Sequence, residues 1–191
     1  VAKAWEQIEL FARRAPWTPR TVLVTGAGPI GLLAALLAVQ RGYDVHVLDL
    51  VTEGRKPRLV ADLGATYHHG SVGDLGFAPD LVVECTGVGA LAFGIVEHLA
   101  PDGVVCLTGI SGGRPATADL SALNRDIVLG NTVVFGTVNA ARGHYEQAVR
   151  ALASADPAWL SRLVSRRVPL DRWPEALQKG RDDVKVVVEL R

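Results

Sequence analysis

A glycine-rich turn between an apolar strand and an apolar helix is the feature that most limits how this chain can fold. The run 21–25 is short, apolar and rich in β-branched residues, and it leads through Gly26, Gly28 and Gly31 into a helix of leucine and alanine. In a Gly-x-Gly-x-x-Gly turn the first glycine permits the tight turn, the second lets the backbone approach a pyrophosphate, and the third lets helix and strand pack closely. The sequence therefore predicts a phosphate-binding turn at the start of this helix.

The residues around this turn extend the prediction to a whole dinucleotide. Pro29 and Ile30 begin the helix, and proline suits a first turn whose amide hydrogens have no partner within the helix. The run 44–49 is typical of the next strand and ends in Asp49, about 20 residues beyond the glycines, where a carboxylate accepts the hydroxyls of an adenosine ribose. We therefore predict dinucleotide binding; the alternative is an α/β glycine turn that holds no ligand.

Charges after Asp49 leave the choice between two nicotinamide cofactors open. A 2′-phosphate carries close to two negative charges, so Asp49 alone would repel it. Arg55, Lys56 and Arg58 follow within a few residues and could donate hydrogen bonds to such a phosphate. The alternative is that these cations only solvate the start of a helix. The sequence thus predicts NADP or NAD as the cofactor, without a preference between them.

Composition argues against several other functions for this chain. With 191 residues and 49% apolar content, it can form one good core, as one domain or as a domain plus a fragment. Twenty basic and twenty acidic residues cancel, which argues against nucleic acid or an anionic membrane as a partner. The sequence has neither a long uncharged apolar run nor a signal-peptide pattern, so we expect a cytoplasmic protein.

Cysteine and histidine spacing predicts no metal site in this chain. Cys85 and Cys106 each lie within an apolar run, without a histidine at ligand spacing, so we predict buried reduced thiols. His68 and His69 are neighbours, and in a strand their side chains point to opposite faces. Glu84 receives no role, because an acid near the cofactor and a core-edge residue paired to an arginine fit the sequence equally well.

Strand-like and helix-like stretches alternate through most of the chain. This alternation predicts an α/β fold with a doubly wound, six-stranded parallel (Rossmann) sheet, preceded by a linking helix over 1–14. Ligands of such sheets bind beyond the carboxyl ends of the strands, where we therefore place further cofactor contacts. The residues predicted there are Thr86, Gly87, Gly109, Ile110 and Ser111. The predicted strands are 21–25, 44–49, 66–68, 80–85, 103–107 and 132–136, and the later helices of this part are 90–99 and 119–128.

The pattern changes in the last part of the chain, beyond the elements that the six-stranded sheet needs. We therefore predict a dinucleotide-binding domain over 1–156, which includes the linking helix, and a separate C-terminal segment over 157–191. The elements predicted here are a helix over 141–153, a break at Pro157, a strand over 163–168, a short capped helix over 171–178 and a final strand over 184–190.

Several short motifs carry a resemblance to a known enzyme family. They are Val24–Gly31, Leu63–Thr66, Glu84–Gly87 and Lys185–Val188. Together they resemble the nucleotide domain of the medium-chain, zinc-dependent alcohol and polyol dehydrogenases. Within that family, Phe135–Asn139 followed by His144–Glu146 is similar to the glucose 1-dehydrogenases. The resemblance covers essentially the whole chain.

The resemblance implies an oxidoreductase that transfers hydride from a sugar, glucose at C1 in this branch, to NAD(P)⁺. It also implies that Thr137 and Val138 face the nicotinamide and that Asn139 reaches the sugar; the alternative for Asn139 is a helix cap. Members of the family carry a preceding catalytic domain with the zinc ligands, and this sequence has no counterpart of it. We therefore expect 157–191 to return into that domain, and we expect this chain alone to be inactive, with no catalytic residue of its own.

Two alternatives to this function remain open at this point, and the sequence also predicts an assembly. One alternative keeps the fold and changes the substrate to another alcohol, a polyol or threonine. The other is a non-catalytic nucleotide-sensing module, against which the elements after residue 157 argue. The run 132–136 would lie at an edge of the sheet, and an apolar, β-branched edge favours pairing with a second copy. We therefore expect a homo-oligomer.

Overall fold

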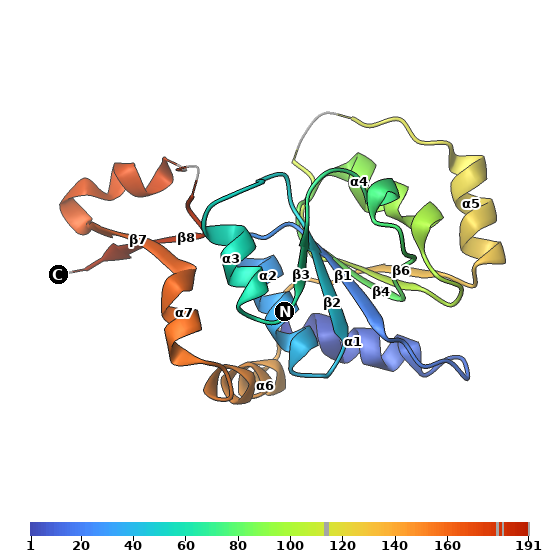
Figure 1. The fold of residues 1–191 in the computed structure, drawn as a ribbon, viewed down its shortest axis with the longest axis horizontal. Helices are drawn as coiled ribbons and strands as arrows, with labels where there is room; N and C mark the ends of the chain where they lie inside the picture. The colour runs from blue at the N-terminus through green and yellow to red at the C-terminus, as the bar shows by residue number, and fades with distance from the viewer. Residues whose placement is uncertain (113–114, 179, 181, 191) are drawn as a thin grey trace.

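A parallel sheet organises most of the molecule (Figure 1). The computed structural model describes residues 1–112, 115–178, 180 and 182–190. Neighbouring strands of the sheet all run parallel, which confirms the predicted doubly wound, six-stranded architecture. In spatial order the strands are β3 (Thr66–His68), β2 (Asp44–Leu48), β1 (Thr21–Thr25), β4 (Leu81–Glu84), β5 (Val104–Leu107) and β6 (Val133–Gly136).

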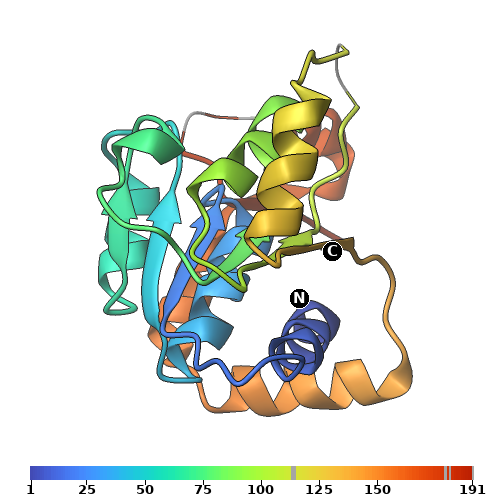
Figure 2. The same cartoon turned by 90° about the vertical axis from the view of Figure 1, so that its right-hand side faces the viewer.

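Helices cover both faces of this sheet (Figure 2), and successive strand residues pack against opposite layers. Val22 and Val24 of β1 belong to one apolar cluster and Leu23 to the other, because side chains alternate across a strand. The first layer contains α1 (Ala2–Ala12), α2 (Pro29–Val39), α3 (Arg55–Ala61) and α6 (Arg142–Ala153). The second layer contains η1 (Val72–Asp74), α4 (Gly89–Gly94), η2 (Ile95–His98) and α5 (Leu120–Leu129).

Two tryptophans tie distant parts of the chain to the first layer. Trp5 of α1 is fully buried, and its Nε1–H donates to the carbonyl of Ala34 in α2 at 3.2 Å. Trp159 lies in a further helix, α7 (Pro157–Leu163), and donates to the carbonyl of Leu59 in α3 at 2.8 Å. A buried indole N–H needs such a partner. Both contacts therefore fix outlying helices against the helices that flank the glycine-rich turn.

The amino ends of the strands are closed by hydrogen bonds between side chains and backbone. Asp80, just before β4, accepts from the amides of Arg20 and Thr21 at 2.7 and 2.9 Å and from the Thr21 hydroxyl at 3.0 Å. Arg14, just after α1, donates to the carbonyls of Asp102 and Asn131 at 2.7 and 2.5 Å. These contacts use polar groups at this end of the sheet to stabilise the chain itself.

The C-terminal segment forms a small substructure beside the sheet (Figure 1). Its strands β7 (Val164–Pro169) and β8 (Lys185–Glu189) pair in parallel, and a 3₁₀ segment, η3 (Leu170–Leu177), lies between them in the chain. Of the predicted segment 157–191, residues 179, 181 and 191 lie outside the described part.

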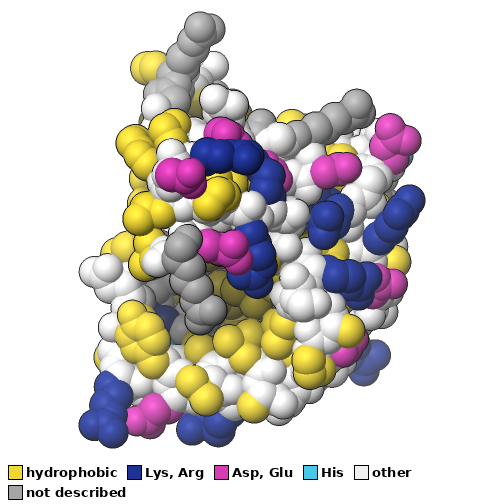
Figure 3. Space-filling model, turned by 90° about the vertical axis from the view of Figure 1, so that its left-hand side faces the viewer, with side chains coloured by type: hydrophobic (Ala, Val, Ile, Leu, Met, Phe, Trp, Pro, Cys, Tyr) yellow, Lys and Arg dark blue, Asp and Glu magenta, His cyan; other side chains and the backbone are white. Residues whose placement is uncertain are grey.

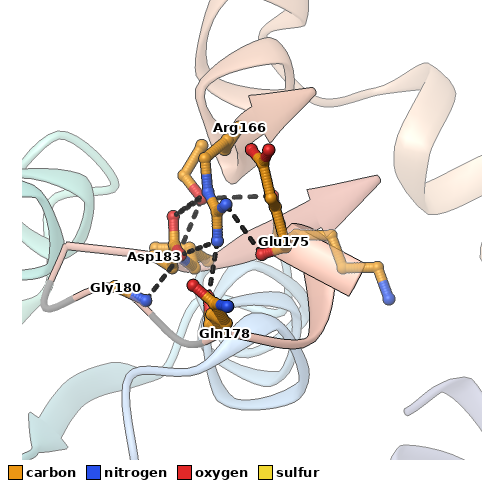
Figure 4. A network of polar contacts seen from close by, with 8 residues as sticks. Arg166, Glu175, Gln178, Gly180 and Asp183 are labelled. Carbon is orange, nitrogen blue, oxygen red and sulfur yellow. Dashed lines mark hydrogen bonds and ion pairs between the residues drawn. The ribbon is translucent and has the colours of Figure 1, made fainter. Parts of the chain in front are cut away.

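Arg166 of β7 is the centre of the polar contacts in this substructure (Figure 4). Its guanidinium contacts the Asp183 carboxylate at 2.8 Å and donates to the carbonyls of Glu175 and Gln178 at 3.0 and 2.6 Å. Asp183 also accepts from the amide of Gly180 at 2.8 Å. One arginine therefore joins the first strand, η3 and the loop before the last strand.

The outer face of this substructure is hollowed and carries apolar side chains among charged ones (Figure 3). It includes a groove of about 700 Å³ lined by residues of β7, β8 and the chain end after β8. Leu170, Trp173 and Leu177 of η3 are each at least half exposed. The residues that line the groove are Val164, Arg167, Val187, Val188, Glu189 and Leu190.

The structure corrects three predictions of secondary structure. Sequence analysis missed α7, which the Asp156 side chain caps by accepting from the amide of Ala158, and the next strand therefore begins at Val164. The predicted capped helix over 171–178 is the 3₁₀ segment η3, which is kinked at Arg172, contains Pro174 and is not capped by Asp171. The predicted helix over 90–99 is α4 followed by the 3₁₀ segment η2.

Candidate functional site

A cleft of about 770 Å³ opens at the carboxyl ends of the central strands. The glycine-rich turn, the end of β2 and the loops after β3 and β4 contribute its walls. Sequence-predicted site residues that meet in this cleft are Gly26, Gly28, Asp49, Lys56 and Thr86. Its other lining residues are Leu48, Leu50, Gly70, Ser71, Val72, Gly73, Cys85, Val88, Ala90, Leu91, Gly94, Glu97 and His98.

Two glycines of the turn have structural reasons to be glycine. Gly26 has a φ of +89°, and its amide donates to the carbonyl of Leu48 at 2.7 Å. A Cβ on Gly31 would lie 1.7 Å from the carbonyl oxygen of Gly26. Any side chain at either position would strain or displace the backbone of the turn.

Gly28 differs from these two, because nothing among the described residues requires a glycine there. Its φ of −82° is accessible to any residue, and no heavy atom of the described residues lies within 4 Å of a Cβ built on it. Gly28 is also the N-cap of α2, with Pro29 in the first turn and Ile30 47% exposed. The space above it borders helix amides that have no partner within the helix, and this is the geometry that accepts a phosphate.

Asp49 lies beside the turn, with its side chain only 11% exposed. Its carboxylate accepts from the amides of Ala27 and Val51 at 2.6 and 3.2 Å and from the Lys56 ammonium at 3.0 Å. Burial alone would raise the pKa of Asp49, but the hydrogen bonds from Lys56 and Ala27 outweigh that effect and hold the pKa below its ordinary value. The carboxylate is therefore ionised where it borders the cleft.

The cations after Asp49 are placed differently from one another. Lys56 is buried, and its ammonium pairs with Asp49, so the cleft wall holds a neutral ion pair instead of an isolated carboxylate. Arg55 donates to the carbonyl of Arg162 in α7 at 3.3 Å, and Arg58 is exposed; neither lines the cleft. The structure thus brings Lys56, but not Arg55, to the predicted ribose position.

A second cleft, of about 830 Å³, continues from the first between α4 and α5. Val88, Ala90 and Gly94 line both clefts, and Gly87 and Ser111 line the second. The second cleft thus meets the first at the loop after β4 and extends between the helices that follow.

Gly87 and Gly109 bring the loops after β4 and β5 into direct backbone contact. A Cβ on Gly109 would lie 2.2 Å from the amide nitrogen of Gly87, and one on Gly87 would lie 2.6 Å from the carbonyl oxygen of Ile110. Gly87 also has a φ of +69°. Both positions therefore require glycine, and the contact leaves the Ile110 side chain 85% exposed beside the clefts.

The end of β6 supplies the remaining predicted residues. The Thr137 amide donates to the carbonyl of Leu107, whereas its buried hydroxyl has no hydrogen-bond partner among the described residues. The Val138 carbonyl accepts from the Lys3 ammonium of α1 at 2.9 Å. Asn139 is exposed with a φ of +64°, and it does not cap α6, whose N-cap is Ala141.

Two contacts near the clefts were not anticipated from the sequence. His46 and His68 approach within 2.8 Å between Nδ1 and Nε2, and both rings contact Phe77. They lie two residues apart in strand register, so only the pairing of β2 with β3 reveals them. Glu84 is fully buried at the end of β4. An acid that ends an apolar strand just before Cys-Thr-Gly is the only sequence signal for it.

The described residues contain neither a cluster of metal ligands nor a membrane-spanning helix. Across 1–112, 115–178, 180 and 182–190, no three His, Cys, Asp or Glu side chains gather closely enough to hold a metal ion. In the same part of the chain, no helix is both long enough and apolar enough to span a bilayer.

Comparisons with known proteins point to one family. A family model described as the glucose dehydrogenase C-terminus matches residues 1–190. The chain is 37% identical to glucose 1-dehydrogenase of Methanocella arvoryzae, over 100% of this chain and 56% of that protein, and 38% identical to glucose 1-dehydrogenase 1 of Caldivirga maquilingensis, over 93% and 52%. The chain thus spans about half the length of the curated relatives it matches.

A solved structure gives the same result. Glucose dehydrogenase of Haloferax mediterranei, in complex with NADP, zinc and gluconolactone, superimposes with a TM-score of 0.90 at 28% identity, over 100% of this chain and 56% of that one. The glycine-rich turn, the strand order and the family match over nearly the whole chain all support the same family. This chain belongs to the glucose dehydrogenase C-terminal domain family.

Proposed function

We propose that this chain is the dinucleotide-binding half of a glucose 1-dehydrogenase, which transfers hydride from C1 of the sugar to NAD(P)⁺. The relatives named above are glucose dehydrogenases, and the Haloferax protein binds NADP and gluconolactone. The observation that carries the proposal is Gly28, whose missing side chain leaves open space at the start of α2 and answers no packing need of the free protein. A pyrophosphate in that space would receive the free helix amides.

The two clefts suggest how the chain holds a dinucleotide. Asp49 accepts the ribose hydroxyls of the adenosine half, and the turn from Gly26 to Gly31 binds the diphosphate. The nicotinamide half lies across the loops after β4 and β5 and the end of β6, where the Thr137 hydroxyl is buried and unpaired among the described residues. A bound nicotinamide would give that hydroxyl a partner.

The proposed substrate contacts and the metal depend on sequence outside this chain. Asn139 is exposed at the end of β6 and presents its amide to the sugar. Zinc, bound by ligands of the other half, would polarise the reacting hydroxyl and lower its pKa. The task of this chain is then to hold the nicotinamide in line with that carbon.

The Asp49–Lys56 pair supports both cofactors. Because Lys56 balances the charge of Asp49, a 2′-phosphate at this wall would not meet an isolated carboxylate. Movement of the Lys56 ammonium from Asp49 to the phosphate would admit NADP, whereas an intact pair leaves Asp49 to accept the hydroxyls of NAD.

Two further parts of the proposal concern the whole protein. The apolar face of β7, η3 and β8 would pack against the catalytic half, which makes 157–191 the return segment. The edge strand β6 would pair with the same strand of a second copy, which gives a homo-oligomer. With no membrane-spanning helix among the described residues, we propose a cytoplasmic location.

Calorimetric titration of the 191-residue chain with NADPH and with NADH, at low and high salt, tests the proposal. We expect binding of one molecule per chain. Tighter and more salt-sensitive binding of NADPH would indicate that Lys56 contacts a 2′-phosphate, and tighter binding of NADH would indicate that Asp49 contacts the ribose. Binding of neither would contradict the proposed function. The chain alone, mixed with glucose and NADP⁺, should produce no NADPH.

A further inference from the structure

Glu84 is a buried carboxyl group that the proposed function does not yet use. It ends β4 with none of its surface exposed, although acidic side chains are almost never fully buried without a partner. No ion pair joins it to a Lys, Arg or His of the described residues. Its cost of burial must therefore be offset by hydrogen bonds.

One oxygen of this carboxyl group receives several donors from the loop that follows. Glu84 Oε1 accepts from the amides of Thr86 and Gly87 at 2.6 and 3.0 Å, and from the Thr86 hydroxyl. That hydroxyl in turn accepts from the amide of Val88, the N-cap of α4, at 3.0 Å. The side chain of Glu84 therefore sets the path of the chain from β4 into α4.

The backbone of Glu84 holds the neighbouring loop in the same way. Its carbonyl accepts from the amides of Thr108 and Gly109 at 2.9 and 3.1 Å and from the Thr108 hydroxyl at 2.7 Å. Its second carboxyl oxygen, Oε2, has no hydrogen-bond partner among the described residues and would lie 2.7 Å from a Cβ on Gly109. One residue thus joins the loops after β4 and β5 with almost no free space.

The loop that Glu84 holds lies between the two clefts. Thr86 lines the first cleft, Gly87 lines the second, and Val88 lines both. A shift of this loop would change the walls that face both halves of a dinucleotide. We propose that Glu84 is a positioning residue for the dinucleotide: it fixes the 85–88 loop in its binding geometry without touching the ligand. This inference rests on the proposed function.

The same strand supplies a matched control at its other end. Asp80 precedes β4, and its carboxylate also accepts from two backbone amides and a threonine hydroxyl, those of Arg20 and Thr21. Asp80 lines neither cleft. Glu84→Gln and Asp80→Asn therefore make the same chemical change at opposite ends of β4, and only the first faces the proposed site.

The test combines thermal unfolding, amide hydrogen exchange and titration with NADH and NADPH on the 191-residue chain. We expect both variants to lower the melting temperature. Glu84→Gln should also weaken dinucleotide binding about tenfold or more and speed exchange of the Thr86 and Gly87 amides by a similar factor, since lost or weakened hydrogen bonds to a buried carboxyl group have effects of that size. Asp80→Asn should leave affinity within about twofold of wild type. If Glu84→Gln does not fold, Glu84→Leu, whose apolar side chain fills the site but cannot accept from the Thr86 and Gly87 amides, should give the same loss of affinity and protection.

The possible outcomes separate this proposal from the proposed function. If wild type binds a dinucleotide and the Glu84 variant binds it as tightly as the Asp80 variant does, the positioning role is wrong and the proposed function stands. If wild type binds neither NADH nor NADPH, the proposed function is wrong, and the positioning role for a dinucleotide is wrong with it.

Discussion

The two ends of the parallel sheet are built from similar contacts but differ in what they leave open. At the amino ends, Asp80 and Arg14 bind backbone groups of their own chain, and the polar groups there are used internally. At the carboxyl ends, Asp49 and Glu84 also bind backbone amides, but glycines at the turn and loops leave two adjoining clefts. The difference teaches that the space left at the carboxyl ends, and not a higher frequency of polar groups, makes them the ligand site that we propose.

Substitution of glycine should give the largest difference in the free energy of unfolding between the two ends of the sheet. Gly31→Ala would place a methyl group 1.7 Å from the carbonyl oxygen of Gly26, so we expect a loss of about 3 kcal/mol or more in the free energy of unfolding, or no folding. Gly42→Ala, before β2 at the amino end, has no heavy atom of the described residues within 4 Å and should cost only about 1 kcal/mol for its φ of +80°. Denaturation in urea measures both, and equal losses would contradict this comparison.

The ion pair at the cleft wall should be the next most sensitive contact. Lys56→Gln leaves the largely buried Asp49 carboxylate without its cation, and we expect a loss of about 2 kcal/mol. The matched control is Arg142→Gln in α6, which breaks an exposed pair with Glu146 and should cost less than about 0.5 kcal/mol. Urea denaturation again provides the measurement. A loss at Lys56 no larger than that at Arg142 would show that the pair does not stabilise the cleft wall.

Acid should weaken the cleft wall through Asp49. The pKa of Asp49 in the folded chain lies below its ordinary value, so the ionised group stabilises the fold at pH values above about 3.9, and this contribution is lost as the pH falls through the lower, folded pKa. Asp49→Asn removes the titrating group and should flatten the fall in stability below about pH 4. Unfolding free energies measured across the acid range for wild type and variant test this. If the unfolding free energies of wild type and Asp49→Asn fall in parallel below about pH 4, this prediction is wrong.

We expect the smallest effect from alkylation of the two thiols, even though Cys85 lines the open cleft. Burial raises the pKa of both Cys85 and Cys106 to about 12, so very little reactive thiolate forms near neutral pH. We expect iodoacetamide to leave both thiols of the folded chain unlabelled at about pH 8 and to label both in denaturant. Mass spectrometry counts the added groups. Rapid labelling of Cys85 in the folded chain would mean that the loop after β4 opens more than its hydrogen bonds allow.

Local sequence signals were sufficient for the sheet but not for everything around it. The six strands and the glycine-rich turn follow from short-range periodicity, and Asp49 follows from its spacing to that turn. The helix α7 was missed although Asp156-Pro157 is a good start signal, because its place depends on Trp159 reaching Leu59 in α3. Likewise, η3 is not one continuous helix, because its backbone is non-helical at Arg172.

The parts of the candidate site that escaped prediction depend on contacts between distant segments. Lys56 was expected only as a cation near a phosphate, and its pairing with Asp49 requires the first turn of α3 to face the end of β2. Glu84 received no role because its hydrogen bonds depend on the path of the loop after β4. Sequence spacing identifies which residues lie at the carboxyl edge, whereas the fold decides which of them contact each other.

Substitution of Gly28 by aspartate is the most direct test that the open carboxyl end binds a dinucleotide. Aspartate is a preferred N-cap residue, and a Cβ at this position meets no heavy atom of the described residues within 4 Å, so the melting temperature should stay the same or rise. The same carboxylate would occupy the proposed diphosphate position and repel it, so binding of NADPH and NADH should fall by about a hundredfold or more. A stable Gly28→Asp chain that binds either dinucleotide as tightly as wild type would contradict the account.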